Sequence, residues 1–282
     1  MNILDEKAHA DYTDTGVWAA KAIKEAKRFG TVNVVSSSKA DVYNHIPKDF
    51  KQTEGAAYLH VTSNNTIYGT QWKNFPEAAT YLVADMSSDI LSRKIDVSKF
   101  GLIYAGAQKN MSCAGVTLAI IRKDILGKVE RSIPTMLDYA THIPEHSMFN
   151  TPPVFPIYVM NRTLSWLKEN GGVEAMEALN NKKSGILYDA IDNSKLFVGT
   201  AAKEDRSTMN VPFIFNKDVV AQEKADELQK EFLAFTKERG LEQLKGHRSV
   251  GGFRASIYNA MPLAGVEALV SAMDAFEKKV LG

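Results

Sequence analysis

Cysteine is scarce in this sequence: Cys113 is the single one among 282 residues. One thiol cannot form an internal disulfide or a zinc site built from several cysteines, and such usage is typical of a reducing compartment. We interpret Cys113 as a small packing residue and not as a nucleophile.

Long apolar runs and a strong net charge are also lacking. No stretch reaches the roughly 18 apolar residues that a membrane span requires, and the start, MNILDEKAHADY, has neither the basic residues nor the apolar run of a signal peptide. The formal net charge of +1 gives no electrostatic reason to expect nucleic acid or a membrane surface as a partner. We expect a cytoplasmic protein with neither partner and without a metal site.

The pattern of apolar residues predicts an α/β fold. Short β-branched or aromatic runs alternate with helical patterns over the first two-thirds of the chain, as in a mostly parallel sheet covered by helices. A helix is expected from about Thr15, closed by Gly30. The expected strands are residues 31–37, 56–62, 81–85, 100–106 and 116–122.

A domain boundary is predicted near Gly172. The segment PPVFPIYVMNRTLSWLKENGG begins with prolines that suit a helix start and ends at a pair of glycines. Residues 1–172 would form a large domain and residues 173–282 a smaller α/β domain. Within the smaller domain we expect helices near 173–191, 219–239 and from 263, and strands near 196–198, 209–215 and 253–258.

Two predicted strands end near side chains that could take part in catalysis. In YLVADMSSDILSRKIDVSKFGLIYAGAQKN, one apolar run ends at Asp85 and the next ends, through small residues, at Lys109. Ligands of open α/β sheets lie beyond the carboxyl ends of the strands, so both side chains would emerge at one edge. This pair suits pyridoxal phosphate, because an amine forms an imine with its aldehyde and a carboxylate keeps its pyridine nitrogen protonated. On pattern alone, Asp85 could equally cap a turn and Lys109 could be solvent-exposed.

Five separated strings resemble motifs of the phosphoserine aminotransferases, class V enzymes of the fold-type I pyridoxal-phosphate family: TSNNTIYGT, VADMSSDILSR, IYAGAQKN, SMFNTPPVFPIY and LKGHRSVGGFRASIYNAMP. They occur in the family's order, and the resemblance runs from about Ala10 to the C-terminus. It implies a pyridoxal-phosphate-binding large domain. The implied reaction is transamination of 3-phosphohydroxypyruvate with glutamate to O-phosphoserine and 2-oxoglutarate in L-serine biosynthesis. A related phosphorylated substrate in pyridoxine biosynthesis is a further option.

The resemblance implies roles for residues around the cofactor. Lys109 would bind it covalently and later move a proton between the substrate α-carbon and the cofactor C4′, while Asp85 would pair with the pyridinium nitrogen. Trp18 would stack on the ring, Thr66 would hydrogen-bond the phenolic oxygen, and Gln108 would bind the phosphate. Read alone, Trp18 would be a core residue, Thr66 a turn residue and Gln108 an exposed amide.

Asn150 and Thr151 lie just before Pro152 and Pro153, where proline keeps the backbone extended. The resemblance implies that both reach the cofactor phosphate of a neighbouring subunit, and hence a homodimer with active sites shared across its interface. Taken alone, Asn-Thr-Pro-Pro is a good helix start.

A basic cluster near the C-terminus would bind substrate. The resemblance implies that His247, Arg248 and Arg254 face it, with Gly251 and Gly252 allowing a tight backbone path between them. Guanidinium groups bind phosphates and carboxylates bidentately, which suits a phosphorylated amino acid. The alternative, scattered surface cations, fits Arg248 better than Arg254, which lies in an apolar run.

The sequence departs from the family at its start. Family members begin upstream, with an arm carrying a His-Arg pair and a strand followed by a Gly-rich turn at a helix N-terminus; residues 1–7 would correspond to the end of that helix. Because a helix N-terminus contributes to phosphate affinity, we expect weaker pyridoxal phosphate binding than in a full-length relative, exposed apolar surface and an unpaired sheet edge. The chain could be a fragment of a normal enzyme or a genuine short protein, including an inactive remnant that acts as a dimeric scaffold.

A class V cysteine desulfurase or lyase is the alternative enzyme. That group typically has histidine immediately before the cofactor lysine, where this chain has Gln108. It also needs a mobile cysteine late in the chain, and none follows Cys113.

Overall fold

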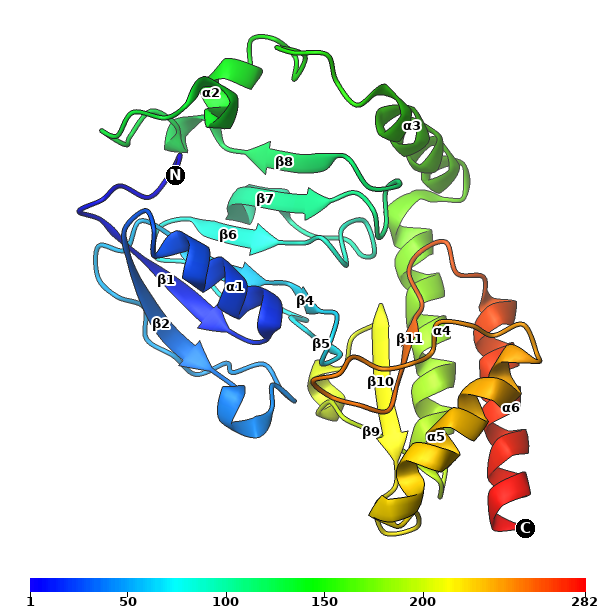
Figure 1. Cartoon of the computed structure of the whole chain (residues 1–282). Helices are drawn as coiled ribbons and strands as arrows, with labels where there is room; N and C mark the ends of the chain where they lie inside the picture. The colour runs from blue at the N-terminus through cyan, green and yellow to red at the C-terminus, as the bar shows by residue number, and fades with distance from the viewer.

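The computed structural model describes all of residues 1–282 and is built on a six-stranded sheet of order β2-β1-β3-β6-β7-β8 (Figure 1). All pairs from β2 to β7 are parallel, and β8 runs antiparallel to β7. The expected α/β fold with a mostly parallel sheet is therefore confirmed. The strands are β1 (His9–Asp14), β2 (Thr31–Ser37), β3 (Leu59–Thr62), β6 (Leu82–Asp85), β7 (Phe100–Gly106) and β8 (Thr117–Ile121).

Strand β1 was not expected from the sequence, although it lies in the sheet between β2 and β3. Its sequence, HADYTD, contains no apolar run of the kind that marks a buried strand. The buried Asp11 carboxylate instead accepts hydrogen bonds from the Asn33 side chain at 3.2 Å and the Thr53 N–H at 2.6 Å. A buried carboxylate is tolerated when it is satisfied in this way.

Residues 1–7 form no helix in this chain, and their correspondence to a helix end in longer relatives stays a prediction. The Asp5 carboxylate accepts hydrogen bonds from the backbone N–H of Glu6 at 2.8 Å and of Glu130 at 2.9 Å. Leu4 is buried in a cluster with Ala10 and Tyr12. These contacts hold the segment in turns against the sheet.

Helix α1 (Val17–Ala26) packs against β1, β2 and β3 and is shorter than the predicted span, because turns occupy the residues before Gly30. The chain then continues through the short antiparallel pair β4 (Asn64–Asn65) and β5 (Thr70–Gln71), the short helix α2 (Tyr139–His142) and α3 (Val154–Glu169).

Cys113 is exposed, so its interpretation as a packing residue is wrong. No helix has the length and apolar character needed to cross a membrane.

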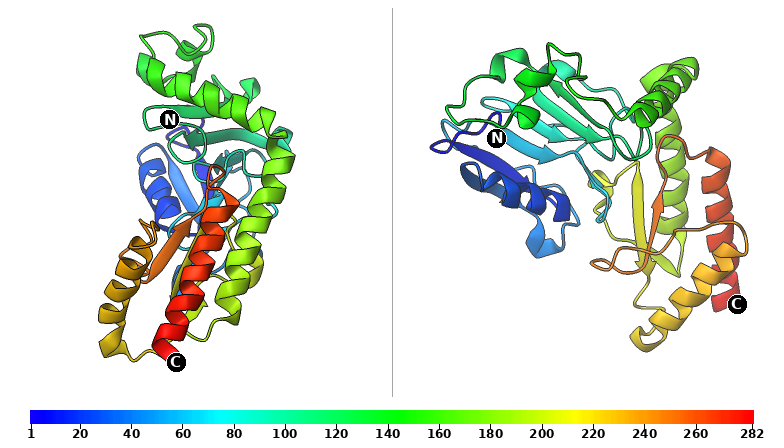
Figure 2. Two further views of the ribbon diagram at one scale, coloured as in Figure 1. Left: turned by 90° about the vertical axis from the view of Figure 1, so that its right-hand side faces the viewer. Right: turned by 45° about the horizontal axis from the view of Figure 1, so that its top comes forward.

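The C-terminal part contains every element expected there, with shifts of a few residues at their ends. Its antiparallel sheet has the order β11-β10-β9, and α4 and α6 pack against each other (Figure 2). The division into domains of residues 1–172 and 173–282 stays a prediction. The elements are α4 (Gly172–Asn193), β9 (Phe197–Gly199), β10 (Asn210–Phe215), α5 (Gln222–Lys237), β11 (Phe253–Ser256) and α6 (Leu263–Leu281).

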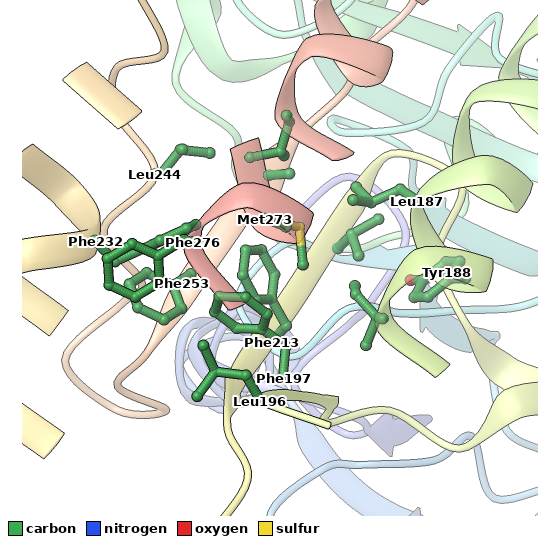
Figure 3. Close-up of a cluster of buried hydrophobic side chains, with 14 of the residues drawn as sticks. Leu187, Tyr188, Leu196, Phe197, Phe213, Phe232, Leu244, Phe253, Met273 and Phe276 are labelled. Atoms are coloured by element: carbon green, nitrogen blue, oxygen red, sulfur yellow. The ribbon is translucent and has the colours of Figure 1, made fainter. Parts of the chain in front are cut away.

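Phenylalanine dominates the core of this C-terminal part (Figure 3). The Phe253 ring lies 4.7 Å from that of Phe232 and 5.1 Å from that of Phe213, and Phe232 lies 5.0 Å from Phe276. Tilted and edge-on pairs of this kind each contribute about 0.5–1.5 kcal/mol beyond the area they bury. The cluster therefore anchors β10 and β11, the strand that carries Arg254.

Candidate active site

The parallel strands β6 and β7 bring Asp85 and Lys109 to one edge of the main sheet. Asp85 ends β6, opposite Tyr104 of β7, and Lys109 follows the end of β7 at Gly106. The Asp85 carboxylate accepts a hydrogen bond from the Ser87 N–H at 2.9 Å. Asp85 thus also caps the following turn, which fixes its carboxylate at the strand end.

The Lys109 amine is held inside this edge. Its Nζ donates a hydrogen bond to the Thr66 hydroxyl at 3.0 Å. Burial lowers the pKa of the Lys109 amine, the positive charge of Arg254 acts in the same direction, and the Asp85 carboxylate opposes both. A lowered pKa increases the neutral, nucleophilic fraction of a lysine.

Thr66 lies in the tight turn between β4 and β5, which is fixed by buried side chains. The Asn65 amide donates to the Thr70 hydroxyl at 3.0 Å and accepts from the Thr15 hydroxyl at 3.3 Å. Gly69 closes the turn at φ 74°, a conformation that favours glycine. The Thr66 hydroxyl is therefore positioned by a rigid hairpin.

Trp18 is not a core residue: its side chain is 43% exposed in the first turn of α1. The centroid of its ring lies 5.7 Å from Lys109 Nζ and 4.5 Å from Lys21 Nζ. An indole face in this position can cover a planar ligand bound at Lys109.

Arg254 of β11 reaches the same site from the C-terminal part. Its Nη1 lies 3.5 Å from the Thr66 carbonyl oxygen, and its Nε is buried without a hydrogen-bond partner. Buried N–H groups are rarely left unpaired, so this guanidinium is suited to an anionic ligand.

His247 and Arg248 lie in the loop before β11 and make no hydrogen bond to Lys109, Thr66 or Arg254. The His247 carbonyl accepts from the Val250 N–H at 2.9 Å and the Gly251 N–H at 2.8 Å. Positive φ angles at Gly251 and Gly252 make the tight path that was expected. His247 is half-buried and Arg248 is exposed.

The structure does not bring Gln108, Asn150 or Thr151 into this group. Gln108 is exposed beside Lys109, with its amide turned back towards Gly106. Asn150 and Thr151 are exposed in the segment between α2 and α3, where the Asn150 amide contacts the Met136 sulfur at 3.0 Å (Figure 1). Within one chain, the site therefore consists of Asp85, Lys109, Thr66, Trp18 and Arg254.

Sequence reasoning missed His60, which is buried close to Asp85. Its Nε2 lies 2.9 Å from the Tyr104 hydroxyl, and its ring stacks on Tyr12 with centroids 4.6 Å apart. Burial lowers the pKa of His60 to about 4, against the opposing influence of Asp85, so the imidazole is neutral at pH 7. The available signal was a single imidazole in the apolar run AAYLHVT.

These residues fit pyridoxal phosphate. The site offers an amine of lowered pKa, a carboxylate at the adjacent strand end, a fixed hydroxyl and an exposed indole face. The unpartnered Nε of Arg254 adds a free hydrogen-bond donor. This set of groups thus fits the cofactor.

Comparisons with known proteins agree with this chemistry. Residues 1–269 match the family model described as aminotransferase class-V. The phosphoserine aminotransferase of Parabacteroides distasonis is 57% identical over 278 residues, covering 99% of this chain and 76% of that protein. That of Flavobacterium psychrophilum is 53% identical over 279 residues, with the same shares covered.

Solved structures give the same result. The phosphoserine aminotransferase of Bacillus circulans subsp. alkalophilus has a TM-score of 0.93 at 47% identity, covering 99% of this chain and 76% of that one. The pyridoxal-phosphate-bound phosphoserine aminotransferase of Trichomonas vaginalis has a TM-score of 0.89 at 41% identity, covering 97% and 77%. The chain thus spans about three quarters of the length of these relatives.

Proposed function

The chain belongs to the class V aminotransferase family, and from that premise we propose that its site carries out the reaction of the phosphoserine aminotransferases it matches. In this reaction the amino group of glutamate is transferred to 3-phosphohydroxypyruvate, giving O-phosphoserine and 2-oxoglutarate in serine biosynthesis. The observation that carries the proposal is the half-buried Lys109 amine at the edge it shares with Asp85, hydrogen-bonded to Thr66.

Lys109 is the proposed nucleophile and proton carrier. When bound, pyridoxal phosphate supplies an aldehyde for amines and a ring that withdraws electrons from the substrate α-carbon. The Lys109 amine would hold the cofactor through its aldehyde, and the same amine, when free, would take a proton from the substrate α-carbon. Its lowered pKa favours both steps.

The neighbouring side chains would orient the cofactor ring and shield it from water. The Asp85 carboxylate would stabilise a positive charge at the ring nitrogen, and the Thr66 hydroxyl that accepts from Lys109 would bind the phenolic oxygen. Trp18 would cover one face of the ring and exclude water from it.

Arg254 and the loop before β11 are the proposed substrate anchors. The free Nε and the remaining donors of Arg254 suit a carboxylate or phosphate, because a guanidinium binds either with two parallel hydrogen bonds. His247 and Arg248 would add positive charge for the second anionic group, and Gln108 would bind the cofactor phosphate. A related phosphorylated substrate of pyridoxine biosynthesis would use the same anchors.

A homodimer is part of the proposal. The segment around Asn150 and Thr151 exposes a group of large apolar side chains, and such patches mark association surfaces. If a second copy covered this group, Asn150 and Thr151 of one subunit would lie close to the cofactor phosphate of the other. Sedimentation velocity tests this, and a monomer at micromolar concentration would contradict it. The exposed residues are Met136, Leu137, Ile143, Met148, Phe149, Val154, Phe155, Ile157 and Tyr158.

We also propose that the enzyme works in the cytoplasm. Cys113 is free and exposed, a state that a reducing compartment preserves. Fractionation of cells that produce the protein would test this location.

The main experiment is trapping of the cofactor. Pyridoxal phosphate is added to the purified chain, the absorbance spectrum is recorded, and borohydride reduction is followed by peptide mapping. A reduced pyridoxyl group on Lys109 is expected, absent in Lys109→Arg and present in the control Lys21→Arg, the other lysine beside Trp18. Transfer of the amino group from phosphoserine to 2-oxoglutarate is then assayed. A folded protein that gives no adduct would favour an inactive remnant.

A further inference from the structure

A chain of buried amide groups joins the C-terminal part to the two loops that carry Asp85 and Lys109. At its centre is Asn259, 5% exposed, in the segment between β11 and α6. The Asn259 backbone N–H donates to Asn110 Oδ1 at 3.1 Å, and its side-chain amide donates to the Leu91 carbonyl at 2.9 Å. Its Oδ1 accepts from the Asn180 amide at 2.9 Å.

The two loops are also bound to each other. Asn110 directly follows Lys109 and donates from Nδ2 to the Ile90 carbonyl at 3.1 Å. The Ser87 hydroxyl accepts from the Gly106 N–H at 3.1 Å, one strand end to the next. A displacement of either loop therefore moves the other.

Helix α4 completes the connection from behind. Asn180, 1% exposed, also donates to the Ser92 carbonyl at 3.0 Å. Lys183, one turn further on, is fully buried, and no carboxylate pairs with it. Its Nζ donates to three carbonyls on either side of Asn259, those of Ile257 at 3.1 Å, Tyr258 at 2.8 Å and Met261 at 3.1 Å. Three acceptors match the three donors of an ammonium group.

Leu91 carries backbone strain at this junction. Its φ of 60° lies in the left-handed region, which a side-chain-bearing residue adopts only when its surroundings impose it. The hydrogen bond from Asn259 to the Leu91 carbonyl is part of that constraint. The loop after Asp85 thus depends on a residue of the C-terminal part for its conformation.

Building on the proposed function, we propose that Asn259 is a positioning residue that fixes Arg254 relative to the Lys109 amine. Arg254 lies on β11, five residues before Asn259. The phenylalanine core holds β11 within the C-terminal part, but only contacts between the two parts can set its distance from Lys109. Asn259 supplies two of these contacts, to Asn110 and Leu91, and its bond to Asn180 fixes it to α4 of the C-terminal part.

A distance measurement tests the proposal without any need for activity. One spin label is placed on the exposed Cys113 and a second on Lys230→Cys, an exposed position of α5. The distance distribution is expected to be narrow in the parent protein and to broaden in Asn259→Ala and in the milder Asn259→Ser. Asn193→Ala is the matched control, because the Asn193 amide also donates to a carbonyl, Asp189 at 2.8 Å, but at the far end of α4.

Kinetics with the cofactor-loaded enzyme separate positioning from a general loss of stability. Asn259→Ala is expected to lower kcat/KM for phosphoserine about tenfold, mainly by raising KM. In an Arg254→Lys background the same substitution is expected to lower kcat/KM less than about twofold, because both changes weaken the same substrate contact. An equal loss in both backgrounds, or an unchanged distance distribution, overturns the proposal. If the parent protein transfers no amino group while the distances broaden as expected, the proposed function fails and the positioning contact stands.

Discussion

The Lys109 amine and the Thr66 hydroxyl lie 3.0 Å apart, although one follows β7 and the other lies in the β4–β5 hairpin. This contact keeps the amine turned into the site, beneath the exposed face of Trp18. It also means that a change at Thr66 acts on both the lysine and the ligand that displaces it.

Thr66→Val removes the hydroxyl with little change in shape. Loss of the proposed hydrogen bond to the cofactor, worth about 1 kcal/mol, is expected to weaken pyridoxal phosphate binding roughly fivefold to tenfold. Equilibrium dialysis against pyridoxal phosphate measures this directly. Thr66→Ser keeps the hydroxyl and should bind pyridoxal phosphate as the parent does. Equal affinity of the valine variant and the parent would show that the Thr66 hydroxyl does not contribute to cofactor binding.

Burial lowers the pKa of the Lys109 amine most, and the charges around it adjust the pH at which it becomes reactive. Arg254 lowers the pKa of the Lys109 amine and Asp85 raises it, so Arg254→Gln should shift the midpoint of Lys109 acylation to higher pH and Asp85→Asn to lower pH. Mass spectrometry of the Lys109 peptide after short acylation pulses follows the reaction. The parent midpoint is expected below 10.5, the value of a free lysine side chain. A common midpoint for all three proteins would contradict this electrostatic coupling.

The buried His60 makes the free energy of unfolding depend on pH in the acid range. Its pKa is about 4 in the folded chain and 6.5 in the absence of burial, so between these values the unfolded state binds more protons. The stabilisation is therefore complete above pH 6.5 and is lost as the pH falls towards 4, by up to roughly 3 kcal/mol. Urea unfolding of the parent and of His60→Gln at a series of pH values measures the difference. The parent should lose stability more steeply, and parallel curves would argue against a neutral buried His60.

Two adjacent glycines before β11 should respond differently to alanine. At Gly252, φ is 55° and an added Cβ would lie 2.5 Å from the Phe213 carbonyl oxygen, so Gly252→Ala should destabilise by roughly 3 kcal/mol. At Gly251, φ is 77° with open space around the Cβ, and about 1 kcal/mol is expected. Urea unfolding compares the two variants. Similar losses would mean that the backbone conformation, and not the contact with β10, sets the cost.

Elements whose signal lies within their own residues could be predicted from the sequence. Strands β2, β6 and β7 are apolar runs with clear ends, and the carboxyl ends of β6 and β7 were enough to place Asp85 and Lys109 at one edge. Strand β1 could not be found in this way, because Asp11 is made compatible with burial by Asn33 and Thr53, which lie far along the chain.

The rest of the site depends on long-range contacts that no local pattern contains. Arg254 meets the Thr66 carbonyl across 188 residues, and Asn259 meets Asn110 across 149. Asparagines in loops are most often read as turn residues, so nothing in the sequence marks Asn259 as a buried link. Likewise, His60 becomes notable only once β3 is seen beside β6.

The phenylalanine core of the C-terminal part has an optical consequence. All three tryptophans, Trp18, Trp72 and Trp166, precede Gly172, whereas the core of the C-terminal part contains several phenylalanines and no tryptophan. Indole emission therefore monitors the first part of the chain alone, while circular dichroism records the helices of both. If the fluorescence and circular dichroism transitions coincide during one denaturation, the two parts unfold as a single unit, and if they separate, the parts unfold independently.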